Sequence, residues 1–314
     1  MPRLVLDTDI GSDCDDTVAL ALALASPEVE LAAVTVVSGD VRLRGRVAAH
    51  LLALGGRSDV PVHVGAERPL GAGTFVWFGH EGVELGGARG AGALSDEPAV
   101  EALLRLFDGR SDLELVTIGP LTNLAAALRR DPGLARRMHR LTVMGGFLSG
   151  TAPDGRPLPQ AIDYNLCGDP EAAATVFAAA IPTRLVPVDV TLRVWLAESD
   201  AAALAAHPRA IGPAVARALR AWAPIQRDGF AGLGAPVPDG AVSFLHDPLA
   251  LACAHDESFC TFSELDLLPR RDDGLFRLAP CAPGTTGAAR VRVATAVDAP
   301  RFVAHVRRRL DIGH

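Results

Sequence analysis

Lysine is absent from this sequence of 314 residues, so all 30 basic residues are arginines. The absence excludes a Schiff-base lysine and the phosphate-binding lysine of a P-loop, because both need an ε-amino group. No apolar run of about 18 residues lacks a charge or a helix breaker, so no segment is predicted to span a membrane. Residues 1–7 show no apolar signal region with a cleavage site, which favours a cytoplasmic location.

Cysteines are few, and acidic residues outnumber basic ones by 37 to 30. The cysteines are odd in number, widely spaced and free of CxxC pairs, at positions 14, 167, 253, 260 and 281. This pattern is typical of a reducing compartment and predicts neither a disulfide framework nor a zinc site. The net charge is −7, and no arginine-rich strip contains interleaved aromatic residues. Nucleic acid is therefore not an expected partner.

Short runs rich in valine and leucine alternate with alanine-rich helical segments along the chain. This alternation predicts an α/β fold with a mostly parallel, Rossmann-like open sheet, covered by helices on both faces, in a single domain over residues 1–314. Strands are expected near 3–6, 31–37, 60–64, 113–117, 141–144, 184–190 and 290–296. Helices are expected near 15–25, 41–54, 97–108, 121–130, 169–180, 210–223 and 299–310.

Glycine and proline cluster in three places, at 65–93, 145–160 and 229–241. In an open α/β sheet, the loops beyond the carboxyl ends of the strands carry the ligand site. These three segments are therefore candidate rims or lids of that site.

An acidic loop follows the first predicted strand and holds five carboxylates within ten residues: Asp7, Asp9, Asp13, Asp15 and Asp16. Like charges this close raise one another's pKa unless a cation or a hydrogen-bond network compensates them. A solvated turn leading into an acidic helix start is the plain structural interpretation. The position at the end of a strand favours a site instead. Oxygen ligands alone indicate calcium or magnesium, and their flexible spacing favours calcium.

Four further segments follow in order: 118–123 (IGPLTN), 143–146 (VMGG), 163–172 (DYNLCGDPEA) and 245–248 (LHDP). Each suits a structural role when taken alone, such as a helix cap or a core position. Together with the acidic loop they resemble the motifs of the nucleoside hydrolase family, and the resemblance covers nearly the whole chain. The acidic loop is two residues longer than the family's commonest form, which leaves Asp13 without an assigned role.

The resemblance implies a calcium-dependent hydrolysis of the N-glycosidic bond of ribonucleosides. Calcium would be held by Asp9, Asp16, Asp247 and the backbone carbonyl of Ile118. Asp9 would take a proton from the metal-bound water that attacks the anomeric carbon. His246 would donate a proton to the departing base, because its reference pKa lies near neutrality.

The resemblance also assigns substrate contacts. Asp15, Asn165 and Asp40 would bind the ribose hydroxyls, Met144 would pack beside the sugar, Asp163 would lie on its 5′ side, and His80 would lie near the base. A surface-loop histidine is an equally good interpretation of His80. Trp77 and Trp222 could stack on a base or belong to the core.

The sequence departs from the family at Asp40, where asparagine is usual, at Asp163, where glutamate is usual, and in an insertion over 147–162. The base therefore stays open, and so does a 5′-monophosphate substrate, since Arg156 in the insertion could pair with a phosphate. Three different functions also stay open: a metal-dependent phosphatase, a nucleoside-binding protein without activity and a structural protein. Haloacid-dehalogenase-like phosphatases need a hydroxyl residue or valine where Gly11 stands. The family resemblance suggests a homodimer or homotetramer.

Overall fold

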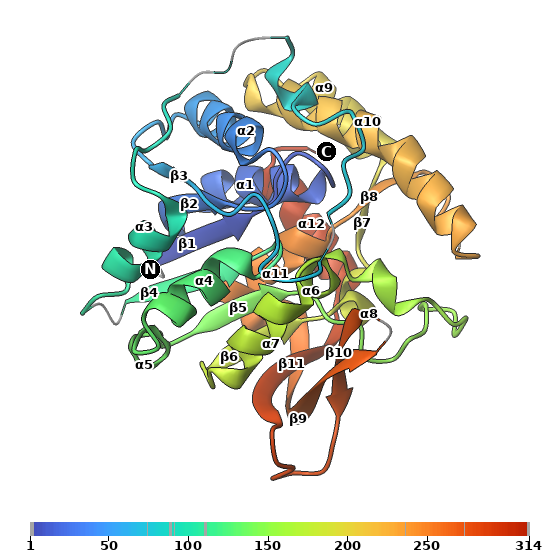
Figure 1. Ribbon diagram of the computed structural model, residues 1–314. Helices are drawn as coiled ribbons and strands as arrows, with labels where there is room; N and C mark the ends of the chain where they lie inside the picture. Colours follow the sequence, from blue (N-terminus) through green and yellow to red (C-terminus); the bar gives the residue numbers. More distant parts are fainter. Residues whose placement is uncertain are drawn as a thin grey trace.

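The central element of the structure is one nine-stranded sheet (Figure 1). The computed structural model describes residues 3–73, 75–87, 90, 92–109, 112–235, 237–272 and 274–312. The strand order of the sheet is β10-β9-β11-β6-β5-β4-β1-β2-β3. In that order the strands are β10 (Leu275–Pro280), β9 (Cys260–Asp272), β11 (Ala289–Val297), β6 (Thr183–Val186), β5 (Leu141–Met144), β4 (Leu113–Thr117), β1 (Arg3–Thr8), β2 (Glu30–Val36) and β3 (Val62–Val64). Among these strands only β9 runs against the common direction, so the predicted mostly parallel α/β sheet is confirmed.

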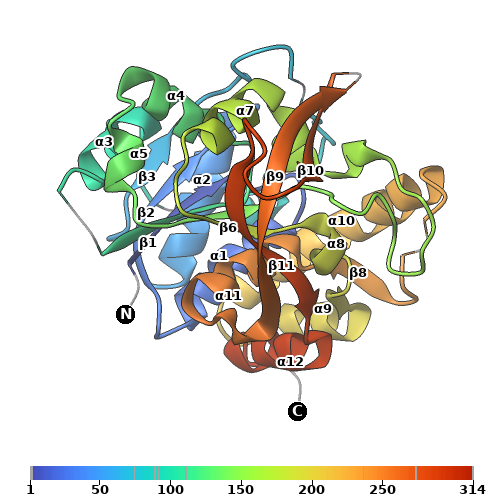
Figure 2. The ribbon, with the colours of Figure 1, turned by 90° about the horizontal axis from the view of Figure 1, so that it is seen from below.

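Helices cover both faces of the sheet, as predicted (Figure 2). Side chains alternate between the faces of a strand, and β1 shows this directly. Leu4 and Leu6 belong to one apolar core, whereas Val5 belongs to the other. The first core includes residues of α1 (Asp15–Ala25), α2 (Val41–Leu54), α11 (His246–His255) and α12 (Ala299–Arg309). The second includes residues of α3 (Ala99–Leu106), α4 (Thr122–Arg130), α5 (Leu134–Arg137) and α7 (Pro170–Ala178).

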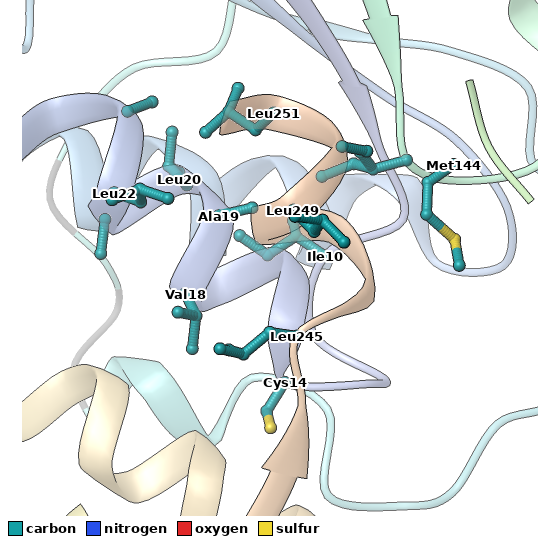
Figure 3. Close-up of a cluster of buried hydrophobic side chains, with 14 of the residues drawn as sticks. Ile10, Cys14, Val18, Ala19, Leu20, Leu22, Met144, Leu245, Leu249 and Leu251 are labelled. Carbon is teal, nitrogen blue, oxygen red and sulfur yellow. The ribbon is translucent and has the colours of Figure 1, made fainter. Parts of the chain in front are cut away.

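Helices α1 and α11, more than 200 residues apart in sequence, pack against each other in the first core (Figure 3). Val18 and Leu22 of α1, with Leu249 and Leu251 of α11, are completely or almost completely buried. Helix α1 follows the loop after β1, α11 starts shortly after a strand that ends at Phe244, and both helices have a carboxylate in the first turn. Their packing therefore brings the acidic loop and the 245–248 segment to the same place.

Two predicted elements end at the wrong residue. The strand expected over 184–190 stops at Val186, and the next residues form the short helix α8 (Val188–Thr191). Pro187 explains this end, because proline has no N–H to donate to a strand ladder. The helix expected over 210–223 continues through Pro224 as α10 (Ile211–Gly232). Ile225 and Phe230, beyond the proline, pack on the first core, and this tertiary packing outweighs the local breaker.

Several elements were not predicted at all. They are the two-stranded sheet of β7 (Trp195–Ala197) and β8 (Ala241–Phe244), the hairpin of β9 and β10, and the helices α5, α6 (Tyr164–Gly168), α9 (Glu198–Ala205) and α11. Three short 3-10 helices lie at Val83–Leu85, Gln160–Ile162 and Glu257–Phe259. Among the described residues, no helix combines the length and apolar character needed to cross a membrane.

Candidate functional site

One cavity lies at the carboxyl ends of β1, β2, β4, β5 and β6, where the sequence analysis placed the site. Nine of the predicted site residues line it: Asp9, Asp15, Asp16, Ile118, Met144, Asp163, Asn165, His246 and Asp247. The second half of α10 closes the cavity with Ile225, Gln226 and Phe230. We refer to the part of the lining that is rich in carboxylates as the carboxylate wall, and to the part formed by Phe78 and α10 as the apolar wall.

Three buried carboxylates meet at the N-termini of α1 and α11. Asp15, Asp16 and Asp247 each offer one oxygen, and these oxygens lie within 4.8 Å of one another. The backbone N–H of Asp247 donates to Oδ2 of Asp15 at 3.1 Å, which ties the two helix starts together. Burial, reinforced by the neighbouring carboxylates, raises the pKa of Asp16 and Asp247 well above the ordinary range. An all-oxygen group of this kind fits a hard divalent cation, which would relieve the repulsion.

Asp9 faces the same cavity from the end of β1, but it lies outside that close group of three in the described chain. The ligand set predicted from the sequence consists of Asp9, Asp16, Asp247 and the Ile118 carbonyl, with Asp15 on the ribose instead. A Cβ on Gly119 would lie 2.7 Å from Oδ1 of Asp9, so only glycine lets the turn after β4 approach this carboxylate. The same turn presents Ile118 to the cavity.

Asn165 and Asp163 are held by the ends of β4 and β5. Asn165 donates from Nδ2 to the carbonyl of Ile118 at 2.9 Å and to that of Met144 at 3.2 Å. Asp163 accepts from the backbone N–H groups of Gly146 at 2.8 Å and Leu166 at 3.2 Å. Burial raises the pKa of Asp163 to about 6, against the effect of these hydrogen bonds. Asp163 thus already has backbone partners on both carboxylate oxygens.

His246 lines the cavity at the start of α11. Its Nδ1 lies 2.6 Å from the hydroxyl oxygen of Thr191, which is fully buried and fixes the ring. Burial lowers the pKa of His246, and the nearby Asp15 carboxylate opposes that effect. The ring of His246 also lies 5.5 Å, centroid to centroid, from that of Phe244. The histidine is therefore held in place at the boundary between the carboxylates and the apolar wall.

The apolar wall carries two polar groups without a partner in the described chain. The rings of Phe78 and Trp222 pack edge to face, with centroids 5.1 Å apart. Nε1 of Trp222 and Nε2 of Gln226 are buried, belong to residues that line this wall and make no hydrogen bond. Oε1 of Gln226 accepts from the N–H of Phe244 at 3.0 Å, which leaves Nε2 as a free donor. Two unsatisfied donors suit a planar ligand that offers acceptors.

Three predicted positions lie away from the cavity wall. Asp40 is exposed and caps α2 by accepting from the N–H of Leu43 at 2.9 Å, so it does not line the cavity. His80 does not line it either, and its Nε2 donates to the carbonyl of Ser12 at 2.8 Å. Arg156 pairs with Asp154 and donates to the carbonyl of Gly234 at 3.1 Å, outside the site.

Of the two tryptophans and of the two carboxylates Asp13 and Asp7, one of each lines the cavity and the other does not. Trp222 lines the cavity, whereas Trp77 does not, and the Arg44 guanidinium lies over the ring of Trp77 at 5.5 Å. Asp13 lines the cavity. Asp7 does not, because it accepts hydrogen bonds from Thr35 and Asn123, and its burial raises its pKa to about 7.

Sequence reasoning missed Arg44, Phe78, Gln226 and Phe230, all of which line the cavity. Gln226 and Phe230 lie beyond Pro224, where the helix was expected to have ended. Phe78 lies in the glycine-rich 65–93 segment. The glycines indicated that this segment borders the site, but they did not indicate which of its residues would line the cavity. Arg44 stands in the predicted 41–54 helix with nothing in its neighbours to distinguish it.

Comparisons with known proteins agree with this geometry. The family model for inosine-uridine preferring nucleoside hydrolase matches residues 4–304. The pyrimidine-specific ribonucleoside hydrolase RihA of Shewanella sp. (strain MR-4) is 34% identical over 262 residues, which cover 79% of this chain and 76% of that protein. A solved plant nucleoside hydrolase, PpNRh1, has a TM-score of 0.83 at 27% identity, over 98% of both chains.

A purine-preferring ribonucleoside hydrolase from Gardnerella vaginalis is nearly as similar in structure, with a TM-score of 0.82 at 27% identity over 98% of both chains. Pyrimidine-specific and purine-preferring enzymes thus both resemble this chain. The family model spans almost all of the described residues, and most of the motif residues on which the resemblance rested line one cavity. The chain belongs to the inosine-uridine preferring nucleoside hydrolase family and is an enzyme of the ribonucleoside hydrolase class.

Proposed function

We propose that this enzyme cleaves the N-glycosidic bond of ribonucleosides in a calcium-dependent reaction, with Asp9 as the general base and His246 as the acid for the departing base. The observation that carries the proposal is the two-sided cavity, with buried carboxylates on one wall and an apolar wall containing unsatisfied donors on the other. A ribose has hydroxyls to satisfy the first wall, and a nucleobase has a flat face and acceptors for the second.

Calcium fits the oxygen-only donor set of the carboxylate wall. Asp16 and Asp247 would hold it, with Asp9 and the Ile118 carbonyl, and Asp15 lies close enough to contribute. When bound, calcium would neutralise these charges, coordinate ribose hydroxyls and make a nearby water more acidic.

The side chains would divide the remaining work. Asp9 would accept a proton from the attacking water, while Asp15 and Asn165 would bind the ribose hydroxyls and Met144 would pack beside the sugar. His246 would pass a proton to the departing base, because Thr191 fixes its ring and the nearby Asp15 carboxylate favours the protonated imidazole against the burial that lowers its pKa. Neighbouring carboxylates would stabilise positive charge that develops on the sugar.

A turnover screen tests the proposal. Purified protein is incubated with a panel of ribonucleosides, with calcium or with a calcium chelator, and the products are identified. Free base and ribose are expected only where calcium is present. Release of phosphate from phosphate esters without cleavage of any nucleoside would overturn the proposal in favour of a metal-dependent phosphatase.

The first prediction concerns calcium binding. Asp247→Asn is expected to weaken calcium affinity by at least about tenfold, because it removes a charged oxygen ligand from the group. Calorimetric titration with calcium measures this change. Asp298→Asn is the matched control, since Asp298 caps α12, does not line the cavity, and asparagine caps equally well. An Asp247→Asn protein with the affinity of the control would contradict the assigned ligand.

The second prediction concerns phosphate. Nucleoside 5′-monophosphates are expected to react with a kcat/KM at least about tenfold below that of the nucleosides, because a dianion on the 5′ side would lie beside the Asp163 carboxylate. Arg156, the candidate phosphate partner, is already occupied by Asp154 and Gly234. Competition between a nucleoside and its monophosphate measures the preference. A higher value for the nucleotide, abolished by Arg156→Ala, would show the opposite.

The third prediction concerns the base. Gln226 lines the cavity and its Nε2 has no partner in the described chain, so we expect it to favour a base with a carbonyl oxygen within its reach. Gln226→Glu keeps an acceptor for the Phe244 N–H and replaces the free donor with an oxygen. The kcat/KM ratio of uridine to cytidine is expected to fall by about tenfold, the effect of one hydrogen bond exchanged for an unpaired group. An unchanged ratio would remove Gln226 from base recognition.

The whole chain, residues 1–314, is proposed to act as a single catalytic domain. Strands from β1 near the amino terminus to β11 near the carboxyl terminus join one sheet, which supports this assignment. The family resemblance supports a homodimer or homotetramer, and analytical ultracentrifugation would measure the assembly.

A further inference from the structure

Arg44 is a buried arginine in the first turns of α2 that no motif of the sequence singled out. It is only 1% exposed, yet it lines the cavity beside the acidic loop. Among the cavity-lining residues of the described chain it is the only arginine. A guanidinium buried this deeply needs hydrogen-bond acceptors for its N–H groups, so the acceptors that it contacts indicate its role.

The hydrogen bonds of Arg44 go to the turns that follow β1 and β2. Nε donates to the carbonyl of Ser38 at 2.6 Å. Nη1 donates to the carbonyls of Asp9 and Ile10, the latter at 2.9 Å. Nη2 donates to the hydroxyl of Ser12 at 3.0 Å. One side chain therefore contacts three residues of the acidic loop and joins them to the neighbouring turn.

In the described chain, no backbone N–H of residues 9–13 donates to a backbone carbonyl, whereas the turn after β2 is also held by the N–H groups of Ser38 and Gly39, which donate to the carbonyls of Ala66 and Glu67 at 2.7 and 2.9 Å. Residues 9–14 belong to neither β1 nor α1, and Gly11 has a φ of +110°. Ser38, in the turn after β2, has a φ of +73°, which is uncommon for a residue with a side chain. Buried carbonyls in such segments need donors from elsewhere, and Arg44 supplies them for Asp9, Ile10 and Ser38.

The Arg44 contacts also extend to the loop over the cavity. The hydroxyl of Ser12 donates to Oε1 of Glu81 at 3.2 Å, and Glu81 in turn accepts from the backbone N–H groups of Phe78 and Gly79. The Arg44 guanidinium stacks over the ring of Trp77. The acidic loop and the segment that carries Phe78 are thus both fixed to this arginine.

We infer that Arg44 is a positioning residue that clamps the backbone of residues 9–12 and so pre-arranges the carboxylates of the acidic loop for calcium. The inference rests on the proposed function for its calcium part. Positive charge alone would repel calcium, whereas a clamp would favour its binding, so the two effects of Arg44 have opposite signs. Arg44→Lys separates them, because lysine keeps the charge and loses the planar fork that reaches several acceptors at once.

The test compares Arg44→Lys with Arg46→Lys, a matched control on an exposed position of the same helix. Calcium affinity is measured by calorimetric titration with calcium alone, and amide hydrogen exchange of residues 9–14 is measured in the metal-free protein. Arg44→Lys is expected to raise the calcium Kd by about tenfold or more and to speed exchange in residues 9–14. Arg46→Lys is expected to change neither.

Thermal unfolding distinguishes positioning from a merely structural role. A structural role would lower Tm equally with and without calcium, whereas the clamp predicts a smaller calcium-induced rise in Tm for Arg44→Lys. Ser12→Ala, which removes one acceptor and leaves Arg44 in place, should shift the Kd in the same direction by a smaller factor, and it serves if the lysine variant does not fold.

The inference would be overturned if Arg44→Lys and Ser12→Ala both bound calcium with wild-type affinity. If the lysine variant does not fold, wild-type affinity in Ser12→Ala alone would overturn it. Either result would leave the proposed function standing. Nucleoside hydrolysis by wild-type protein that binds no calcium would instead overturn the calcium part of the proposed function. Hydrogen exchange in the metal-free variants would then decide the clamp, and unchanged exchange of residues 9–14 would refute it.

Discussion

Asp9→Asn is expected to lower kcat by at least about 10²-fold while substrate binding stays measurable, because the amide cannot take a proton from the attacking water. Asp9 lines the cavity at the end of β1, and the glycine at 119 leaves room beside its carboxylate. The close carboxylate group at the helix starts consists of Asp15, Asp16 and Asp247, and all three are retained in this variant. Single-turnover and steady-state kinetics on one nucleoside measure the loss.

Asp40→Asn is the matched control for this experiment. Asp40 is a carboxylate in the turn after the neighbouring strand β2, but it is exposed and caps α2, and asparagine is an equally good cap. We expect its kcat and KM to equal those of the wild type. Equal losses in the two variants would mean that Asp9 acts only through charge, and a loss in Asp40→Asn alone would restore the ribose contact that the sequence analysis assigned to it.

A second large effect is expected from the 2′ hydroxyl of the sugar. The kcat/KM of ribonucleosides should exceed that of 2′-deoxyribonucleosides by at least about 10³-fold. The reason is that buried carboxylates built to receive a hydroxyl are left unpaired when it is missing. Asp15, Asp16 and Asp247 are each nearly inaccessible to solvent, at 2%, 3% and 3% exposure, so bulk water would not easily replace the hydroxyl. Uridine against deoxyuridine and inosine against deoxyinosine give the ratio.

Loss of the 5′ hydroxyl provides the matched comparison on the other side of the sugar. Asp163, the residue assigned to that side, already accepts two backbone hydrogen bonds. A 5′-deoxynucleoside is therefore expected to lose less than about tenfold in kcat/KM, since little is left unpaired. Equal efficiency of riboside and 2′-deoxyriboside would argue that no metal or carboxylate holds the 2′ hydroxyl.

Local patterns were sufficient for the parts of the fold that lie within one segment. The helices starting at Asp15, Val41 and Ala299 begin at the predicted residues, because their first-turn residues and apolar periodicity are written in the adjacent sequence. The strands β7 to β10 and the helix α11 were missed. Their apolar patterns are too short or too mixed to indicate a strand or a helix locally. These elements form because neighbouring strands, or the surface of α1, provide packing and hydrogen-bond partners.

The sequence by itself determined that carboxylates follow the first strand, that a histidine and an aspartate precede a proline at residue 248, and that these motifs belong to a nucleoside hydrolase. Such features are contiguous, so each can be recognised without knowing what it touches. Only the tertiary structure decided which groups meet. Asp15 joins Asp16 and Asp247 because α1 packs on α11, and Gln226 reaches the cavity because packing carries α10 past Pro224. These outcomes depend on contacts between segments far apart in the chain, and a local pattern contains no record of them.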